Sequence, residues 1–352
     1  MKNFIADLQA RVKHHAAHRI PLSISGTATK IFYGGKIVGE PLVLSSYSGV
    51  IDYQPRELVL TVRAGTPLAV IETVLAAEKQ MLPFEPPYFG EGGTIGGIVA
   101  SGLSGPRRPY VGAVRDFILG TRLLSGKGEV LRFGGQVIKN VAGYDVSRLM
   151  SGAMGSLGIL LDLTFKVLPR PVAEITLCFE ANQTDAIRRM NEWAGKPLPL
   201  SATMWYQGKL MVRLSGGKNL AAVRQKMGGE KMPDHTAAAH WRNIANHAHI
   251  FFQGDMPLWR LSLPQTAAPL GLENPELIEW GGGLRWLRGD WDAKILRSQV
   301  QALGGHATLF RGGDKSAGVF HPLDPVLAKV HRNLKNAFDP ANILNRGRMD
   351  NF

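Results

Sequence analysis

Residues Gly90 to Asp116 read G-E-G-G-T-I-G-G-I-V-A-S-G-L-S-G-P-R-R-P-Y-V-G-A-V-R-D, and eight of these 27 residues are glycine. Glycine permits positive φ angles and lets backbone N–H groups approach a bulky ligand, because no Cβ stands in the way. Successive N–H groups, together with the start of a short helix, form a concave site for anions. The stretch therefore predicts a pyrophosphate-binding loop, with Thr94 as an additional hydroxyl donor.

Two common nucleotide motifs do not account for this stretch. The Rossmann fingerprint G-x-G-x-x-G requires a different glycine spacing from that of Gly90, Gly92 and Gly96, and the Walker pattern G-x-x-x-x-G-K-[ST] is absent. A glycine-rich loop without a ligand is the alternative. The long patterned end, which runs from Tyr110 to Asp116, favours a ligand.

The segment G-G-T-I-G-G-I-V-A-S, followed by Tyr110, Gly112 and R-D-F-I-L-G, resembles the FAD domain of the vanillyl-alcohol oxidase and p-cresol methylhydroxylase (PCMH) superfamily. Within it, the chain is most similar to the FAD-binding E subunits of bacterial glycolate oxidase. The resemblance implies an α+β fold, with a two-lobed PCMH-type FAD-binding domain over residues 1–170 (lobes 1–80 and 81–170). It also implies a short cap domain over 171–320, and a C-terminal segment, 321–352, that returns to the FAD domain.

Two further stretches carry the same resemblance. The stretch from Ile138 to Ile159 resembles the family's K-N-x-x-G-Y-D-L-x-x-L-x-x-G-S-x-G-T-L-G-I pattern, and F338-D-P-A-N-I-L-N-R-G-R-M resembles the family's D-P-x-x-x-L-N-P-G-K. In the second, Arg346 stands where the family usually has proline, so Asn345 and Arg346 are both candidates for contact with the flavin.

A small-residue loop, Ser25 to Lys30, occupies the position of the family's first pyrophosphate loop. An ordinary β-turn is the alternative interpretation of this loop. Covalent family members often carry a flavin-linking histidine here; this loop has none, so we expect non-covalent FAD. The expected FAD-binding residues are Ser25, Gly26, Thr27, Ala28, Thr29, Lys30, Gly92, Gly93, Thr94, Ile95, Gly96, Gly97, Ala100, Ser101, Gly102, Gly105, Gly112, Arg115, Asp116, Gly158, Ile159, Asn345 and Arg346.

The order of predicted strands and helices changes after Pro169-Arg170-Pro171. Alternating apolar residues predict strands at 174–180, 201–206 and 209–214 with helices at 184–193 and 218–227, which is a ferredoxin-like split β-α-β-β-α unit. A weaker copy follows, with strands at 258–263, 277–280, 284–288 and 306–310 and a helix at 291–303. We expect the two units to form one antiparallel sheet.

Oxidation of a 2-hydroxy acid by a flavin enzyme requires a cation for the carboxylate and a base for the hydroxyl proton. The catalytic subunits of the family often carry H-x-G-D-G-N-x-H, and the nearest stretch here is R-G-G-D-K-S-A-G-V-F-H over 311–321. Arg285, His306, Arg311 and His321 are therefore weak catalytic candidates. His235, His240, His247 and His249 lack a zinc-ligand pattern and predict a helix surface, so no metal site is expected.

The composition and net charge limit the kinds of partner and the cellular location that we expect for the chain. Cys178 is the single cysteine, so the chain holds no internal disulfide and no iron–sulfur cluster. Neither a signal peptide nor a membrane span is evident, which favours a cytoplasmic protein. The formal net charge is +13 without a nucleic-acid-binding motif. Peripheral contact with the inner face of the cytoplasmic membrane, docking to an acidic subunit, and a generally basic proteome are the three explanations of that charge.

Three functions remain open at this point. The first is an FAD-binding subunit that oxidises glycolate to glyoxylate in a complex with a homologous flavin subunit and an iron–sulfur subunit. The second is a flavin-binding structural or electron-transfer subunit without its own substrate site. The third is a stand-alone FAD enzyme, a 2-hydroxy-acid dehydrogenase or a nicotinamide-dependent reductase; the broken D-G-N stretch argues against it.

Overall fold

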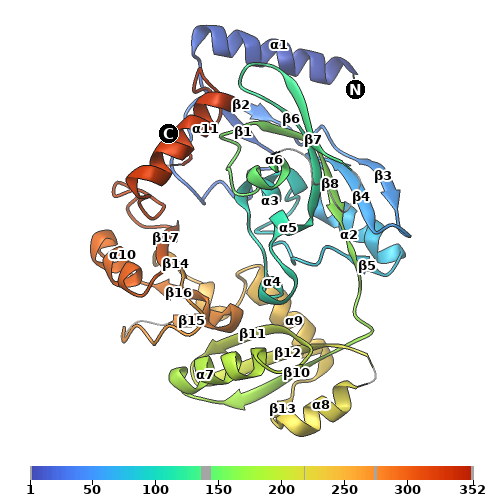
Figure 1. Cartoon of the computed structure of the whole chain (residues 1–352), viewed down its shortest axis with the longest axis vertical. Helices are drawn as coiled ribbons and strands as arrows, with labels where there is room; N and C mark the ends of the chain where they lie inside the picture. Colours follow the sequence, from blue (N-terminus) through green and yellow to red (C-terminus); the bar gives the residue numbers. More distant parts are fainter. Residues whose placement is uncertain (1, 136–143, 218, 273–275, 350–352) are drawn as a thin grey trace.

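The computed structural model describes residues 2–135, 144–217, 219–272 and 276–349. The described chain is built around two antiparallel sheets that lie one above the other in Figure 1. We refer to the part around the first sheet, together with α1 and α11, as the five-stranded half, and to the part around the second sheet as the eight-stranded half. The mixed, mainly antiparallel architecture confirms the expected α+β class.

The first sheet has the strand order β3-β4-β8-β6-β7. Its interior-facing residues are almost all apolar, and short helices cover them to form the largest buried core of the molecule. The elements of this part are β3 (Val50–Gln54), β4 (Val59–Arg63), β6 (Ile118–Leu124), β7 (Val130–Gly134), β8 (Ile159–Lys166), α2 (Leu68–Ala77), α3 (Ile95–Ser101), α4 (Arg108–Val111), α5 (Val114–Phe117) and α6 (Val146–Leu149).

A smaller layer joins the two ends of the chain. Strands β1 (Leu22–Ser25) and β2 (Glu40–Val43) pair in parallel, and helix α1 (Lys2–His18) packs beside them. Leu8 and Val12 of α1 are buried there against Ile343 and Leu344, which follow helix α11 (Pro325–Phe338). The C-terminal segment thus lies against the N-terminal strands, as Figure 1 shows by the red and blue ribbons at the top.

The five-stranded sheet contains strands from both sides of residue 80, where the boundary between the two lobes is expected. Strands β3 and β4 precede that boundary, yet β4 pairs with β8 from Val59 opposite Lys166 to Arg63 opposite Asp162. The reason is that Leu60 and Val62 of β4 are fully buried in the same core as Leu163 and Phe165 of β8. Residues 50–63 therefore share their sheet with residues beyond 80 rather than with β1 and β2.

The second sheet has the order β13-β10-β12-β11-β15-β16-β14-β17. Pairing of β11 with β15 joins two smaller groups of strands into one sheet, as the sequence predicts. The elements are β10 (Ala173–Glu180), β11 (Leu200–Tyr206), β12 (Lys209–Gly216), β13 (Glu230–Lys231), β14 (Leu258–Ser262), β15 (Glu276–Glu279), β16 (Leu284–Arg288), β17 (His306–Arg311), α7 (Gln183–Ala194), α8 (Leu220–Met227), α9 (Asp234–Ala245), α10 (Ala293–Ala302) and the 3-10 turns η1 (Ile250–Phe252) and η2 (Trp280–Gly282).

The two halves meet across an aromatic cluster. Tyr33, Leu103 and Met154 come from the five-stranded half and pack with Trp286 and Phe310 of the eight-stranded half. A short antiparallel pair, β5 (Gln80–Met81) with β9 (Leu168–Pro169), lies next to the chain crossing between the halves. The aromatic cluster buries the face of the second sheet that is turned towards the first half.

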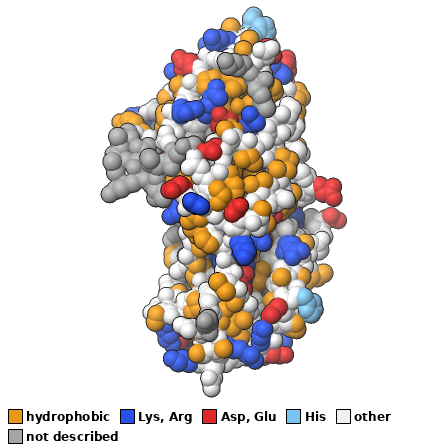
Figure 2. Space-filling model, turned by 90° about the vertical axis from the view of Figure 1, so that its right-hand side faces the viewer, with side chains coloured by type: hydrophobic (Ala, Val, Ile, Leu, Met, Phe, Trp, Pro, Cys, Tyr) orange, Lys and Arg blue, Asp and Glu red, His pale blue; other side chains and the backbone are white. Residues whose placement is uncertain are grey.

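No helix among the described residues is long and apolar enough to cross a membrane. On the face seen in Figure 2, Lys and Arg side chains are scattered from top to bottom with Asp and Glu between them. The excess of positive charge is therefore not gathered into one continuous patch on this face.

Candidate functional site

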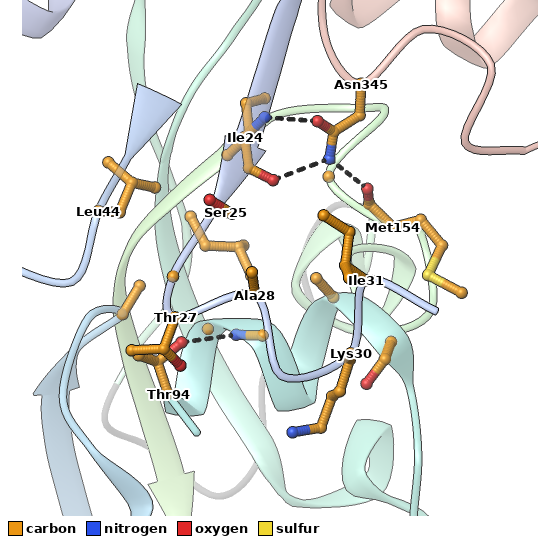
Figure 3. A pocket seen from close by; sticks show the side chains of 18 of the residues that line it. Ile24, Ser25, Thr27, Ala28, Lys30, Ile31, Leu44, Thr94, Met154 and Asn345 are labelled. Carbon is orange, nitrogen blue, oxygen red and sulfur yellow. Dashed lines mark hydrogen bonds between the residues drawn. The ribbon is translucent and has the colours of Figure 1, made fainter. Parts of the chain in front are cut away.

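A groove lies between the turn that follows β1 and the first turn of helix α3 (Figure 3). Its empty space, including the solvent at its open mouth, amounts to about 820 Å³. Its walls contain Ile24, Ser25, Gly26, Thr27, Ala28, Thr29, Lys30, Ile31, Ile37, Leu44, Ala64, Thr94, Gly96, Gly97, Ala100, Ser101, Met154, Gly155, Gly158, Leu160, Asn345 and Arg348. Four stretches far apart in the sequence, 24–31, 94–101, 154–160 and 345–348, thus supply most of the walls, and Ile37, Leu44 and Ala64 complete them.

The first wall is the loop 25–30, and all six of its residues line the groove. A Cβ on Gly26 would lie 2.2 Å from Oγ1 of Thr94, so only glycine allows the loop to lie this close to α3. The Thr27 hydroxyl donates a hydrogen bond to the carbonyl of Gly92 at 2.9 Å. This contact ties the loop to the glycine-rich stretch that organises the sequence.

The second wall is the N-terminus of α3. Thr94 caps the helix, because its Oγ1 accepts a hydrogen bond from the N–H of Gly97 at 3.3 Å. The next two glycines serve different purposes. A Cβ on Gly96 would meet Ala64 at 2.8 Å, whereas a Cβ on Gly97 would meet nothing nearer than Thr94 Oγ1 at 3.4 Å. Gly96 is therefore required by packing, and Gly97 leaves space on the groove side.

Asn345 fastens three walls together. Its Oδ1 accepts a hydrogen bond from the N–H of Ile24 at 2.6 Å, and its Nδ2 donates to the carbonyl of Met154 at 2.7 Å (Figure 3). The C-terminal motif thus reaches the groove at Asn345. Arg346, the other residue expected to contact the cofactor, is exposed and does not line the groove.

Arg348 is a groove residue that the sequence analysis missed. It is buried, and its guanidinium donates to the carbonyls of Lys30 and Ile31, each at 2.7 Å. Burial lowers the pKa of Arg348 to about 10. Its position one glycine beyond Arg346 was the available signal, since R-G-R places two arginines on the same returning segment.

Lys30 is a buried cation in the loop that forms the first wall. Its Nζ donates to the carbonyl of Tyr88 at 3.2 Å and lies 5.8 Å from the centre of the Phe89 ring. Because the side chain is buried, the pKa of the Lys30 ammonium falls to about 8. A polyanion in the groove would find a cation here that is poorly compensated by the protein.

Other predicted residues lie outside the groove walls. Ile95 and Ile159 are completely buried in the cores, and Gly102 ends α3 in the left-handed conformation with φ 65°. Arg115 and Asp116 face each other near the surface at 4.0 Å. The residues concerned are Gly92, Gly93, Ile95, Gly102, Gly105, Gly112, Arg115, Asp116, Ile159 and Arg346. The first part of the Ile138–Ile159 motif, 138–143, lies outside the described residues.

The missed wall residues are mostly apolar. The apolar side chains among them form the hydrophobic part of the groove walls. Their positions in the sequence do not distinguish them from ordinary core residues. They are Ile24, Ile31, Ile37, Leu44, Ala64, Met154, Gly155 and Leu160.

The four catalytic candidates do not form one site. Arg285 is completely buried, and its guanidinium donates to the carbonyls of Gly282, Ala267 and Ala268. Arg311 donates to the carbonyl of Phe252 at 2.6 Å. Both arginines are thus occupied in holding loops of the eight-stranded half.

The remaining two candidates lie at the outer edge of the second sheet. The rings of His306 and His321 are 6.4 Å apart, and Nδ1 of His321 accepts the N–H of Ala307 at 3.4 Å. Burial lowers the pKa of both imidazoles. Neither residue lines the groove.

The prediction that the central histidines lie on a helix surface is wrong for His247, which is buried, whereas His240 is half-buried on α9. His247 stacks on Phe252 with ring centres 3.9 Å apart, and burial holds its pKa well below the usual range. Burial also lowers the pKa of His240 to about 4. The chain turns inward after α9, and this carries His247 into the aromatic cluster. Among the described residues, no three His, Cys, Asp or Glu side chains are grouped closely enough to hold a metal ion.

Comparison with known proteins shows the family of the chain. A family model described as "FAD binding domain" matches residues 4–134. The glycolate oxidase subunit GlcE of Escherichia coli (strain K12) is 43% identical over 343 residues, which cover 97% of this chain and 96% of that subunit. The chain belongs to the GlcE family of FAD-binding subunits. This confirms the resemblance that the glycine-rich stretch indicated.

More distant relatives share parts of the GlcE-family chain. The D-lactate dehydrogenase of Anaerostipes hadrus is 31% identical over 49% of this chain and 36% of its own length. The glycolate oxidase subunit GlcD of Bacillus subtilis (strain 168) is 30% identical over 48% of this chain and 36% of its own length. The solved alkyldihydroxyacetonephosphate synthase has a TM-score of 0.65 at 14% identity, covering 96% of this chain and 74% of the synthase, and so shares the fold.

The cofactor of the family is FAD, and the groove suits it. The open space at Gly97 and the close approach at Gly26 provide backbone where a diphosphate needs to come near. Lys30 supplies a cation beside this backbone, and the apolar side chains of Leu44, Ala64 and Leu160 provide surfaces for flat rings.

Proposed function

We propose that this GlcE-family chain is the FAD-binding subunit of a glycolate oxidase complex, which oxidises glycolate to glyoxylate and passes the electrons to a partner subunit. The observation that carries the proposal is the similarity to the E. coli subunit along almost the whole length of both chains. The groove supports it, because backbone from four stretches converges where a dinucleotide would lie.

The residues that would hold FAD are those of the groove walls. The loop 25–30 and the α3 terminus at Thr94–Gly97 would receive the diphosphate, and Asn345 and Arg348 would keep the returning segment in place. FAD supplies the two-electron acceptor for the α-carbon hydride of a 2-hydroxy acid. Among the described residues, the groove walls contain no histidine or cysteine, and Cys178 lies in β10 of the other half, which supports non-covalent binding.

The proposed partners are a homologous flavin subunit and an iron–sulfur subunit. A single cysteine cannot ligate a cluster, so electrons that leave the flavin need a carrier outside this chain. The net charge of +13 favours an acidic partner surface or the anionic inner face of the cytoplasmic membrane. We accordingly place the chain in the cytoplasm, with peripheral attachment to that membrane.

A second candidate function is a flavin-binding electron-transfer or structural subunit without its own substrate site. The stretch 311–321 favours it, because its side chains are engaged in other contacts. Arg311 holds the carbonyl of Phe252, and Lys315 donates to the carbonyls of Phe32 and Gly34, each at 2.8 Å. The position that resembles the family's catalytic stretch is here a clamp between the two halves.

The test is co-expression of this chain with and without its neighbouring flavin and iron–sulfur subunits. We expect a yellow chain whose FAD is released by acid precipitation, and glycolate-dependent dye reduction by the complex. Glycolate oxidation by the isolated chain as fast as by the complex would contradict the proposed partners. A complex that forms without oxidising glycolate would contradict the proposed activity.

A further inference from the structure

Two aliphatic side chains are exposed where the groove opens to solvent. Ile31 lines the groove (Figure 3), yet it is 55% exposed, and Val38 is 49% exposed. Ile37, between them, also lines the groove. We refer to residues 31–38, together with residues 346–348 that pair with them, as the rim. Single exposed aliphatic residues are common on protein surfaces, so these gain significance from their place beside the candidate FAD site.

The C-terminal segment holds the rim in place. The N–H of Gly35 donates to the carbonyl of Arg348 at 2.9 Å, and the N–H of Val38 donates to the carbonyl of Arg346 at 3.3 Å. Because backbone hydrogen bonds join the two segments, the rim presents its exposed side chains from a fixed backbone. A surface that is already ordered loses less conformational entropy when a partner binds to it.

The rim is positively charged. Lys36 and Arg346 are exposed, and neither residues 26–39 nor residues 340–349 include an acidic residue. Within the described part of the chain, no carboxylate oxygen lies within 4.0 Å of either cation. The two exposed cations and the two exposed aliphatic residues thus share one surface.

The acidic groups that adjoin the rim face other partners. Glu40 lies 3.8 Å from Arg11, and Asp339 is completely buried. At the seam between the halves, the carboxylate of Asp314 accepts the N–H of Ser316 at 2.8 Å. An acidic surface outside the chain would therefore meet the cations of the rim without competition from these carboxylates.

The groove indicates which partner needs this surface. Electrons that leave FAD have to reach a carrier outside the chain, since Cys178 alone cannot ligate a cluster. Electron transfer slows steeply with distance, so the carrier has to dock beside the open side of the groove. The rim borders that side, because Ile31 and Ile37 line the groove and Ile31 is also exposed.

We propose that the rim is the centre of the docking surface for the electron-accepting subunit, which the proposed function takes to be the iron–sulfur subunit. The partner surface that fits is apolar opposite Ile31 and Val38 and acidic opposite Lys36 and Arg346, as protein interfaces combine an apolar centre with polar surroundings. A standard interface covers about 800 Å² on each partner, so surface around the rim takes part as well. The inference rests on the proposed function and deepens it by naming where the acceptor binds.

An anionic membrane fits the rim less well. Segments that lie in the headgroup region present a long apolar face, usually with tryptophan, phenylalanine or leucine. The exposed large apolar side chains of the rim are Ile31 and Val38. A bilayer over the rim would also cover the side of the groove that an electron carrier has to approach.

The test compares matched variants of the full-length, FAD-loaded chain in the co-expressed complex. The complex is diluted, and mass photometry gives the dissociation constant of the iron–sulfur subunit. We expect Val38→Asp and Arg346→Glu each to raise this constant about tenfold or more, because each places a negative charge opposite an acidic surface. Val70→Asp and Arg56→Glu make the same changes at exposed positions outside the rim and should change it less than about twofold. Ile31 is left unchanged, because it also lines the groove.

Further measurements separate docking from folding and from FAD binding. FAD content and melting temperature should match those of the unmodified chain in every variant. Arg346→Lys keeps the charge and should retain most of the affinity for the partner. Salt should weaken the unmodified complex more than the complex with Arg346→Glu, because screening removes an attraction that this variant has already lost.

Several results would overturn the docking surface. One is an unchanged dissociation constant of the iron–sulfur subunit in both rim variants. Others are variants that lose only the homologous flavin subunit, only self-association of this chain, or only binding to vesicles of phosphatidylcholine and phosphatidylglycerol. Each of these results would assign the rim to a different occupant.

The outcome separates this inference from the proposed function. A complex whose rim variants keep the iron–sulfur subunit and oxidise glycolate would overturn the docking surface alone. Rim-dependent binding of that subunit in a complex that fails to oxidise glycolate would overturn the proposed activity alone.

Discussion

The two halves of the molecule make their sites in different ways. In the five-stranded half, the groove is formed largely by backbone, at the loop 25–30 and at the first turn of α3. In the eight-stranded half, the candidate groups are side chains, and Arg285 and Arg311 use theirs to hold carbonyls within the protein. A site made of backbone requires glycine at fixed positions and is visible in a sequence. A site made of arginines is not, because arginine serves structure and ligands equally well.

The largest effect that we expect is the loss of FAD affinity when a substitution blocks the site made of backbone. Gly97→Val places a branched side chain in the open space beside Thr94. We expect FAD affinity to fall by at least ~30-fold, which corresponds to about 2 kcal/mol, because the diphosphate loses its approach to the helix terminus. The ratio of FAD to protein after gel filtration, with far-ultraviolet circular dichroism as a check on folding, measures this.

A matched control is Gly217→Val in the eight-stranded half. Nothing lies within 4 Å of a Cβ at Gly217, so FAD content should stay at the level of the unmodified chain. Gly96→Val is a poorer test, since its Cβ would meet Ala64 at 2.8 Å and disturb packing directly. Full FAD occupancy in Gly97→Val would mean that the diphosphate does not lie at α3.

The second prediction uses the one buried amine in the groove wall. Burial lowers the pKa of Lys30 to about 8, and a bound diphosphate favours the charged ammonium. FAD affinity should therefore fall as the pH rises above about 8, by up to about tenfold per pH unit until the pKa of the bound state is reached. Lys30→Met should bind FAD more weakly and without this pH dependence.

The FAD-free chain should show the opposite trend. The folded-state pKa of Lys30 is lower than its unfolded value of 10.5, so the folded chain binds fewer protons and gains stability as the pH rises from about 8 towards 10.5. Lys36→Met, a change at an exposed lysine nearby, is the control and should leave both pH profiles unchanged. If Lys30→Met retained the pH dependence of the unmodified chain, Lys30 would not be the titrating group.

The smallest expected effect concerns the clamp between the halves. Lys315→Met removes the donors to Phe32 and Gly34 and should lower the free energy of unfolding by about 1 kcal/mol. Because this lysine holds backbone rather than substrate, glycolate oxidation by the complex should change less than about threefold. Thermal unfolding and dye-reduction rates measure the two quantities, with Lys329→Met on exposed α11 as the control. A hundredfold loss of turnover in a stable, FAD-loaded chain would instead return the stretch 311–321 to the active site.

The sequence predicts the groove and the secondary structure well where local rules decide. Thr94 caps a helix, Gly96 allows a close approach to Ala64 and Gly97 leaves space, and the strands of the second sheet follow from alternating apolar residues. The pairing of β4 with β8 could not be predicted in the same way, since it depends on contacts between residues about a hundred positions apart.

The surroundings of individual side chains could not be predicted either, because they too depend on contacts between residues far apart in the sequence. His247 is polar and follows a surface helix in the sequence, yet its ring is stacked on Phe252 in the aromatic cluster. Arg108 and Arg285 are the same residue type, but one lies at the seam beside an indole and the other is completely enclosed by carbonyls. Only the tertiary structure distinguishes them, because their partners come from other segments of the chain.

The position of Asn345 has a consequence for the order of events during protein synthesis. This residue fastens Ile24 to Met154, although 321 positions separate it from the first and 191 from the second. Since chains emerge from the ribosome N-terminus first, the strands and helices on both sides of the groove can form well before their fastener exists. We expect the cofactor to enter a nearly finished protein, after the ribosome has released the last few residues, rather than to serve as a template for its folding.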